Sequence, residues 1–350
     1  MNKKLTIYDI AREAGVSTAT VTRVMSGQNN VRPATRERVQ QVIDLHGYTP
    51  SAIARDLENG NNKTLGIIMP SVTSPYFAQL FSAAEDEARR NGYSVLLYQL
   101  PANQEIESEV VNELIRRRLE GAFFVGGIWE ACKPGLRAAL SHLNQYMPIV
   151  AICPPITGLD CICLYNDLIS CVRHAVRHLH VLGHRRIAFI GGSFQVGGSG
   201  ARGQGFLEEL RDLGLPDIPA YHLEGGFDAE SGERSVQRLL SSLPKEQQPT
   251  ALVAFNDLVA LGAIKQLKLM GLKLPDDMAI IGCDNQFFCP YTDPPLTSID
   301  LHPDEHARSA ICELLMSKQS SVRQSFTIVR DATLVVRESC GAKLGYRRLG

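Results

Sequence analysis

Apolar and polar positions alternate with helical spacing in two short runs near the start of the chain, and a tight turn separates the runs. Ile10, Ala11 and Ala14 recur at this spacing in the first run, and Val21 and Val24 recur in the second. Residues three or four positions apart share one face of a helix. The pattern therefore predicts two short helices whose apolar faces meet in a small core.

Residues at the ends of these runs predict where each helix begins and ends. Thr6 with Asp9 has the spacing of a capping box, Gly15 suits the left-handed residue that ends a helix, and Ser17 suits the N-cap of the next. The second helix then presents a short, polar outward face: Thr18, Ala19, Thr22 and Arg23. Such a face can enter the major groove of DNA. A helix-turn-helix is predicted, and two ordinary helices of a small bundle are the alternative.

A third helix and a linker follow this pair. The helix is expected over Pro33 to His46, and a short helical run is expected over residues 51–57. That run covers barely two turns, which is marginal for a helix alone in water, so we expect it to order only on binding. The polar stretch 58–63 then separates the first part of the chain from the rest.

From residue 64 onward, short apolar strands alternate with amphipathic helices. The expected strands are Leu65–Met69, Ser94–Tyr98, Gly121–Val125, Ile149–Ile152, Arg186–Ile190, Ala220–Leu223, Ala251–Phe255 and Ala279–Cys283. Continuous apolar strands separated by helices indicate parallel sheets that are covered on both faces. Because the pattern occurs twice, we expect an α/β core of two doubly wound subdomains with a ligand at the carboxyl ends of the strands, between the subdomains.

Charge distinguishes the first fifty residues from the remainder. The 350-residue chain is 44% hydrophobic and carries a net charge of −1, yet residues 1–50 hold seven Lys or Arg against four acidic residues. A small basic head on a slightly acidic body suits a protein that contacts phosphates at one end only. Neither an export signal nor a long apolar run is recognisable, so a cytoplasmic protein without a membrane segment is expected.

Several motifs together resemble the lactose-repressor and galactose-repressor (LacI/GalR) family of bacterial transcription regulators. They are the run Leu5–Leu57, the strand Thr64–Pro70, Gly183–Ile187, Phe255–Asp257, Leu272–Asn285 and Pro294–Ile299. The resemblance implies a helix-turn-helix head (1–50), a hinge helix and linker (51–63) and a periplasmic-binding-protein-like core (64–340). It divides the core into an N-subdomain (64–163, 296–326) and a C-subdomain (164–295, 327–340), with crossings near Leu164, Leu296 and residue 327. The tail 341–350 is expected to be disordered.

The resemblance also implies which residues bind DNA. They are Thr6, Tyr8, Ser17, Thr18, Ala19, Thr20, Thr22, Arg23, Thr35, Ala54, Arg55 and Leu57. Arg23 is expected to read guanine, while Tyr8, Ser17 and Thr35 mainly position phosphates. In similar repressors the residue matching Leu57 wedges into the minor groove and kinks the duplex. Glu58 departs from the family, in which a basic residue often follows that leucine.

An effector site follows from the same resemblance. Its expected residues are Ser71, Tyr76, Phe77, Arg202, Phe227, Asn256, Asp257 and Asp284. Guanidinium, carboxylate and amide groups hold polyhydroxyl ligands by paired hydrogen bonds, and an aromatic face covers the ring. A carbohydrate is the expected effector. Two departures, Cys153 and Tyr165, leave its specificity open, so a less hydroxylated or a phosphorylated ligand is also considered. Asp284 has the alternative role of a turn residue, and Asn256 that of a helix cap.

Other classes of protein have weaker support. Gly198 to Gly203 has the spacing of a dinucleotide-binding loop, but the loop after Ile190 is too long for that turn, so neither an enzyme nor a cofactor is expected. In the family this loop leads to a helix whose first turn carries Arg202. The cluster Cys153, Cys161, Cys163 and Cys171 with His174 and His178 fits no standard zinc pattern. A ligand-binding module without DNA regulation is the second candidate.

The sequence therefore predicts a sequence-specific transcription regulator, most simply a repressor. It is expected to bind a pseudo-palindromic operator as a homodimer and to respond to a small-molecule effector held between the two core subdomains. The sequence leaves open which effector and which operator are bound.

Overall fold

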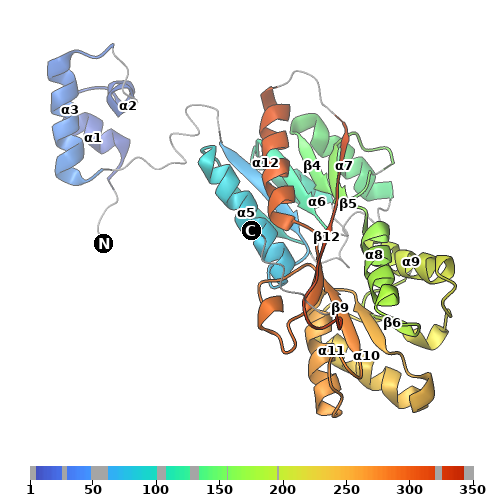
Figure 1. Ribbon diagram of the computed structural model, residues 1–350. Helices are drawn as coiled ribbons and strands as arrows, with labels where there is room; N and C mark the ends of the chain where they lie inside the picture. The colour runs from blue at the N-terminus through green and yellow to red at the C-terminus, as the bar shows by residue number, and fades with distance from the viewer. Residues whose placement is uncertain are drawn as a thin grey trace, which may run out of the picture. The chain divides into compact units, whose positions relative to one another are not determined.

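The computed structural model describes residues 5–25, 30–48, 62–100, 108–126, 134–155, 157–194, 197–319 and 325–342. The chain divides into two compact units, Met1–Lys63 and Thr64–Gly350. The first is the helical head and the second is the α/β core (Figure 1). No helix of the described residues is long and apolar enough to cross a membrane.

The described residues of the head form three helices: α1 (Ile7–Glu13), α2 (Thr18–Met25) and α3 (Pro33–His46). The predicted caps are confirmed. The Thr6 N–H and hydroxyl both donate to the Asp9 carboxylate, Gly15 has φ of +61°, and the Ser17 hydroxyl accepts from the Thr20 N–H at 3.3 Å. Ile10, Ala11, Ala14, Val21 and Val24 lie in one buried cluster, to which α3 adds Val39 and Ile43. The head is a helix-turn-helix stabilised by a third helix.

The first sheet of the core has the strand order β11-β5-β4-β3-β1-β2, and all its pairs are parallel. Its strands are β1 (Thr64–Met69), β2 (Ser94–Gln99), β3 (Gly121–Val125), β4 (Ile149–Ile152), β5 (Ile162–Asn166) and β11 (Thr327–Arg330). Helices α5 (Pro75–Arg90) and α12 (Pro303–Gln319) pack on one face, and α6 (Ser108–Arg116) and α7 (Pro134–Tyr146) on the other. Helix α5 begins at Pro75, and the Ser74 side chain makes no cap hydrogen bond.

The second sheet has the order β12-β10-β9-β8-β6-β7, in which only β12 is antiparallel to its neighbour. Its strands are β6 (Ile187–Ile190), β7 (His222–Leu223), β8 (Ala251–Ala254), β9 (Ala279–Cys283), β10 (Thr297–Asp300) and β12 (Thr333–Val335). Its helices are α8 (Leu168–Val181), α9 (Gly197–Asp212), α10 (Ala229–Ser242) and α11 (Asp257–Leu269). The two subdomains of the core can be followed in Figure 1.

Buried side chains on both faces of these strands explain why they form a covered sheet. Along β9, Ala279, Ile281 and Cys283 face the cluster made by α8 and α9, while Ile280 faces the cluster made by α10 and α11. Successive strand residues point to opposite faces, so a continuous apolar run is what a sheet covered on both faces requires. The predicted doubly wound α/β core is confirmed.

The chain crosses between the subdomains at different residues from those expected. Strand β5 lies wholly in the first sheet, so the first crossing follows Asn166. Strand β10 pairs with β9 in the second sheet, so the return follows Asp300 and does not occur at Leu296. Strand β11 pairs with β5, so the third crossing lies between Arg330 and Thr333 and not at 327. Hydrogen-bonded partners, which the local pattern does not reveal, decide to which sheet each strand belongs.

Two further expectations need correction. The strand expected over Ala220–Leu223 begins only at His222, because Pro219–Tyr221 forms a 3-10 turn that places Pro at its first position, where the missing N–H is not needed. The tail does not leave the core at Gly341, since Ala342 still packs against the second subdomain.

Candidate functional site

Most of the predicted DNA-contacting side chains of the head lie at its surface. Tyr8 is 69% exposed, Ala19 and Arg23 are exposed on α2, and Thr18, Thr20, Thr22 and Thr35 are partly exposed. Thr6 and Ser17 are exposed although both also cap helices. The fold thus separates the buried apolar side of α2 from an accessible polar side. The hinge residues Ala54, Arg55 and Leu57 lie outside the described residues.

In the core, Arg202 and Asp284 meet at the carboxyl end of the second sheet. Arg202 lies in the second turn of α9, one turn later than expected, because the helix already begins at Gly197. Asp284 directly follows β9. The Arg202 Nη2 and the Asp284 Oδ1 are 3.6 Å apart, and only 10% and 12% of these side chains are exposed. Two residues that lie far apart in the sequence therefore bring a guanidinium and a carboxyl group together in a nearly buried position.

The turn that carries Asp284 has an unusual backbone. Asp284 has φ of +105° and Asn285 has φ of +47°, which is costly for residues with a Cβ. Hydrogen bonds hold the turn: the Asp284 N–H donates to the Ile299 carbonyl at 2.8 Å, and the Asn285 N–H donates to the Ser298 hydroxyl at 3.0 Å. Strain that is fixed in this way is typical of functional sites, so this turn supports a role for Asp284 beyond that of a simple turn residue.

Asp257 supports this turn through hydrogen bonds inside the protein. It is fully buried, and its carboxylate accepts from the Gln286 N–H at 2.7 Å, the Ser298 hydroxyl at 2.6 Å and the Cys289 thiol at 3.1 Å. Burial raises its pKa to about 6, although these three donors oppose the shift. The expectation that Asp257 contacts the effector does not fit this geometry, because its oxygens are already bonded inside the protein.

The ionisation of Asp284 differs strongly from that of an exposed aspartate. Burial raises its pKa to about 8, the nearby guanidinium of Arg202 partly opposes the shift, and the charge of Asp257 adds to it. At neutral pH much of the Asp284 carboxyl therefore keeps its proton. In that form it can donate a hydrogen bond as well as accept one.

An aromatic wall lies against the guanidinium of Arg202. The Arg202 Cζ is 4.3 Å from the centroid of the Phe255 ring, and this ring is 4.9 Å from that of Phe227. Phe227 is 52% exposed, as suits a side chain that caps a ligand. Asn256 fixes this arrangement, because its side chain caps α11 at the Val259 N–H and donates to the Phe227 carbonyl at 2.9 Å. Asn256 is thus a cap that also positions the aromatic wall.

From the first subdomain, Tyr76 reaches the same site. It packs against the core clusters of both subdomains. Burial and the charge of Asp284 raise the pKa of its hydroxyl, while Arg202 lowers it, which places the ring beside this pair. Phe77 packs edge-on against Tyr76, with ring centroids 5.3 Å apart, and Ser71 bonds within its own loop to Thr73. No described contact joins Ser71 or Phe77 to Arg202, so their part in ligand binding stays a prediction.

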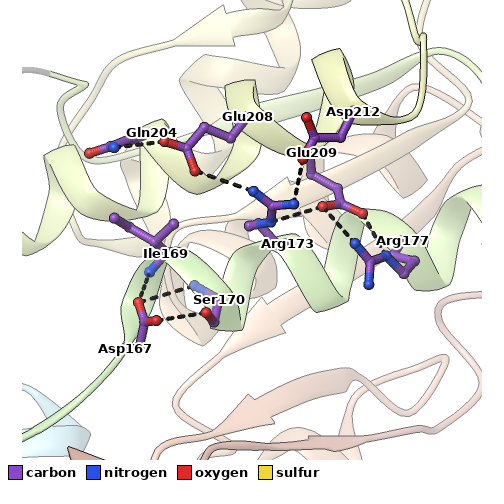
Figure 2. A network of polar contacts seen from close by, with 9 residues as sticks. All are labelled: Asp167, Ile169, Ser170, Arg173, Arg177, Gln204, Glu208, Glu209 and Asp212. Carbon is purple, nitrogen blue, oxygen red and sulfur yellow. Dashed lines mark hydrogen bonds and ion pairs between the residues drawn. The ribbon is translucent and has the colours of Figure 1, made fainter.

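Ion pairs between α8 and α9 hold the helix that carries Arg202 (Figure 2). The Arg173 guanidinium contacts Glu208, Glu209 and Asp212, and Arg177 binds Glu209 at 2.7 Å. Glu209 is fully buried. The helices are also very close, because a Cβ at Gly205 would lie 2.4 Å from the Ile169 carbonyl oxygen. Charge pairing and a glycine contact together fix the position of α9.

The glycine pattern and the cysteine cluster take structural roles. Gly203 lies inside α9, where a Cβ would meet the Phe194 ring at 2.5 Å, so this glycine allows close packing. Cys161 and Cys163 lie 3.8 Å apart in the core of the first subdomain, whereas Cys171 lies in that of the second. Within the described residues, no three His, Cys, Asp or Glu side chains are arranged to hold a metal ion.

Comparisons with known proteins decide the family. Residues 6–51 match the model described as bacterial regulatory proteins, lacI family, and residues 176–340 match a periplasmic binding protein-like domain. Across 337 residues, 96% of each chain, the protein is 32% identical to the HTH-type transcriptional repressor CytR of Escherichia coli K12. The chain belongs to the lacI family. It is a DNA-binding transcription regulator with a core that binds a small-molecule effector, and it is not an enzyme.

Other members of the lacI family agree with this assignment. The chain is 32% identical over 354 residues to the repressor PurR of Erwinia tasmaniensis, covering 98% of this chain and 99% of that one. A CelR–cellobiose complex is 26% identical with a TM-score of 0.70 and covers 96% of this chain and 99% of its own. The Lac repressor dimer bound to operator shares the fold, with a TM-score of 0.84 at 24% identity over 97% of this chain and all of that one.

Sequence reasoning missed three residues of this lacI-family site. Phe255 stacks on Arg202, the Cys283 Sγ accepts from Arg202 at 3.6 Å, and the thiol of Cys171 is close enough for the guanidinium to lower its pKa, although burial raises it more. All three are apolar or weakly polar residues in elements that pack against the core, so the hydrophobic pattern gives them the same appearance as core residues. The position of Cys283 directly before Asp284 was the one available signal.

Proposed function

We propose that this regulator is a cytoplasmic repressor that binds a pseudo-palindromic operator as a homodimer. Binding of a carbohydrate effector would raise or lower its affinity for the operator. The observation that carries the proposal is the nearly buried pair of Arg202 and Asp284 at the carboxyl end of the second sheet, next to an exposed aromatic ring. Doubly wound folds bind ligands at this end of the strands. The named relatives support it, since CytR and PurR are repressors and CelR is seen with cellobiose.

The DNA side of the proposal rests on the exposed face of α2. Its apolar residues are committed to the core of the head, so Ala19 and Arg23 are available to the major groove while Ser17 and Tyr8 are available to phosphates. Leu57 is proposed as the minor-groove wedge of the hinge. A dimer would place two such heads on two half-sites of an operator.

The effector side rests on residues from both subdomains. Arg202 and Asp284 belong to the second subdomain, and Tyr76, which lies against them, belongs to the first. A ligand held by all three would favour one relative arrangement of the subdomains. The ligand can change the free energy of DNA binding by no more than the difference between its binding free energies for the two arrangements. Such a difference is typically about 1 to 3 kcal/mol.

The experiment is a metabolite screen followed by an operator titration. Full-length wild type, Arg202→Ala and Asp284→Ala are screened by thermal shift, and each hit is then tested for its effect on operator affinity. Ligand-dependent operator affinity in the wild type, lost in both variants while ligand-free operator binding stays near wild type, is expected. If either variant responds at the same ligand concentration as the wild type, that residue does not contact the effector.

A further inference from the structure

The guanidinium of Arg202 is a buried cation whose hydrogen bonds are incomplete. Its Nη2 donates to the Cys283 Sγ at 3.6 Å, a weak acceptor, and its face lies on the Phe255 ring. Its Nε is buried and has no hydrogen-bond partner within the described part of the chain. A buried donor without an acceptor is unfavourable, and in a charged group it is more so. The position therefore calls for an acceptor that the protein itself does not provide.

The charge of Arg202 is also poorly balanced. Within the part of the chain that the structure describes, its ion-pair partner is Asp284, and the 3.6 Å separation exceeds the usual length of a charge-assisted hydrogen bond. Asp257, the next acid, is committed to three donors of its own. The other groups around the guanidinium are the phenol of Tyr76, two thiols and an aromatic ring. Burial raises the pKa of Asp284, so its carboxyl balances the guanidinium of Arg202 less well than an exposed aspartate would.

We infer that the effector carries an oxyanion, either a carboxylate or a phosphate, which binds the guanidinium of Arg202 through Nε. This inference rests on the proposed function, in which Arg202 contacts the effector. A planar guanidinium matches the paired oxygens of carboxylate and phosphate, and a charged acceptor balances a buried cation better than a hydroxyl group does. A neutral polyol would satisfy the donor but leave the charge uncompensated.

The test uses the full-length protein with simple anions and one matched sugar pair. Thermal unfolding is followed with inorganic phosphate or acetate, against chloride at equal ionic strength, because phosphate also stabilises proteins without binding them. Calorimetry then compares the affinity of the protein for ribose 5-phosphate with its affinity for ribose. The variant is Arg202→Gln, and the control is Arg211→Gln, an exposed arginine of the same helix. Arg202→Lys, which keeps the charge but lacks the planar fork, serves if the glutamine variant does not fold.

We expect phosphate or acetate to raise the unfolding temperature of wild type and Arg211→Gln more than that of Arg202→Gln, and the stronger of the two anions identifies the acidic group. Ribose 5-phosphate should bind at least about tenfold more tightly than ribose. Equal stabilisation of wild type and Arg202→Gln by both anions overturns the inference. An uncharged ligand whose binding depends on Arg202 also overturns it but leaves the proposed function standing. If Arg202→Gln leaves effector binding unchanged, the result contradicts both this inference and the proposed function.

Discussion

The Asn285 side chain donates a hydrogen bond from Nδ2 to the Asp300 Oδ2 at 2.9 Å, and this bond joins the turn of the effector site to the segment in which the chain returns to the first subdomain. The other Asp300 oxygen accepts from the His302 N–H at 2.7 Å. His302, with φ of +52°, reaches Thr333 across the third crossing, with 3.0 Å between Nε2 and Oγ1. The site and two crossings thus form one hydrogen-bonded unit.

The first crossing is linked to the others by a second group of side chains. The His306 Nε2 lies 2.9 Å from the Asn166 Oδ1, and the Asn166 Nδ2 donates to the Arg330 carbonyl at 3.1 Å. Since the Asn166 Oδ1 can only accept a hydrogen bond, the proton of the neutral His306 ring must be on Nε2. Burial and the charge of Arg330 lower the pKa of His306 to about 4, so the ring is neutral at physiological pH. Near physiological pH the hydrogen bonds of His306 and Asn166 therefore join neutral groups.

The first prediction concerns Asp300. Asp300→Ala removes the two carboxylate oxygens that accept from the Asn285 side chain and the His302 N–H. The turn at 284–286 should therefore open more readily while the sheet around it stays intact. Hydrogen exchange of the Asn285 and Gln286 amides should accelerate roughly tenfold, because a hydrogen bond to a charged group contributes about 1.5 to 3 kcal/mol. Asp276→Ala, which changes an exposed acid on the loop before β9, is the control. Unchanged exchange at the turn would show that Asp300 does not hold it.

A second prediction compares two neighbouring glutamates that contact the same arginine. Glu209 is fully buried and binds Arg173 and Arg177, whereas the Glu208 side chain is 31% exposed and binds Arg173 at 3.3 Å. Glu209→Gln should lower the free energy of unfolding by about 1 to 3 kcal/mol, and Glu208→Gln by less than about 1 kcal/mol. Urea denaturation measures both. Similar losses for the two variants would mean that burial does not decide the strength of this network.

The third prediction is a pH dependence of stability. Burial raises the pKa of Asp284 in the folded protein to about 8, compared with about 4 when unfolded. Between about pH 4 and about pH 8 the unfolded chain releases the Asp284 proton, whereas the folded protein keeps it. The stabilising contribution of Asp284 is therefore complete at low pH and is lost as pH rises towards about 8. Asp284→Asn cannot ionise. The variant should therefore gain stability relative to wild type as pH rises across this range, and a constant difference in unfolding temperature would contradict the assigned pKa.

The fourth prediction concerns base recognition by Arg23. Arg23→Ala should weaken operator binding by about 1 to 3 kcal/mol per half-site and relax the preference at one base pair, because bidentate contact with guanine provides that discrimination. Arg38→Ala, on the exposed side of α3, should leave every base preference unchanged. Binding to a library of operator variants measures both effects. Uniform weakening by Arg23→Ala, with no altered position, would assign Arg23 to the phosphates instead.

The sequence by itself determined the local elements and the family. The helix caps at Thr6, Gly15 and Ser17 and the buried strands around Ile67 and Ile281 depend on interactions within a few residues, or on continuous apolar runs, and the pattern shows both. The short strands β5, β10, β11 and β12 were not predicted, because they carry little pattern of their own and are defined by their partners in the sheets.

Only the tertiary structure decided which residues act together. The family resemblance suggested Asp257 and Asp284 alike, but the fold buries one among three donors and sets the other against Arg202. It also placed Phe255 on the guanidinium and left the Nε of Arg202 without an acceptor among the described residues. Burial and hydrogen-bond satisfaction arise from contacts between distant segments, and the free energy of a polar group depends on those contacts more than on its neighbours in sequence.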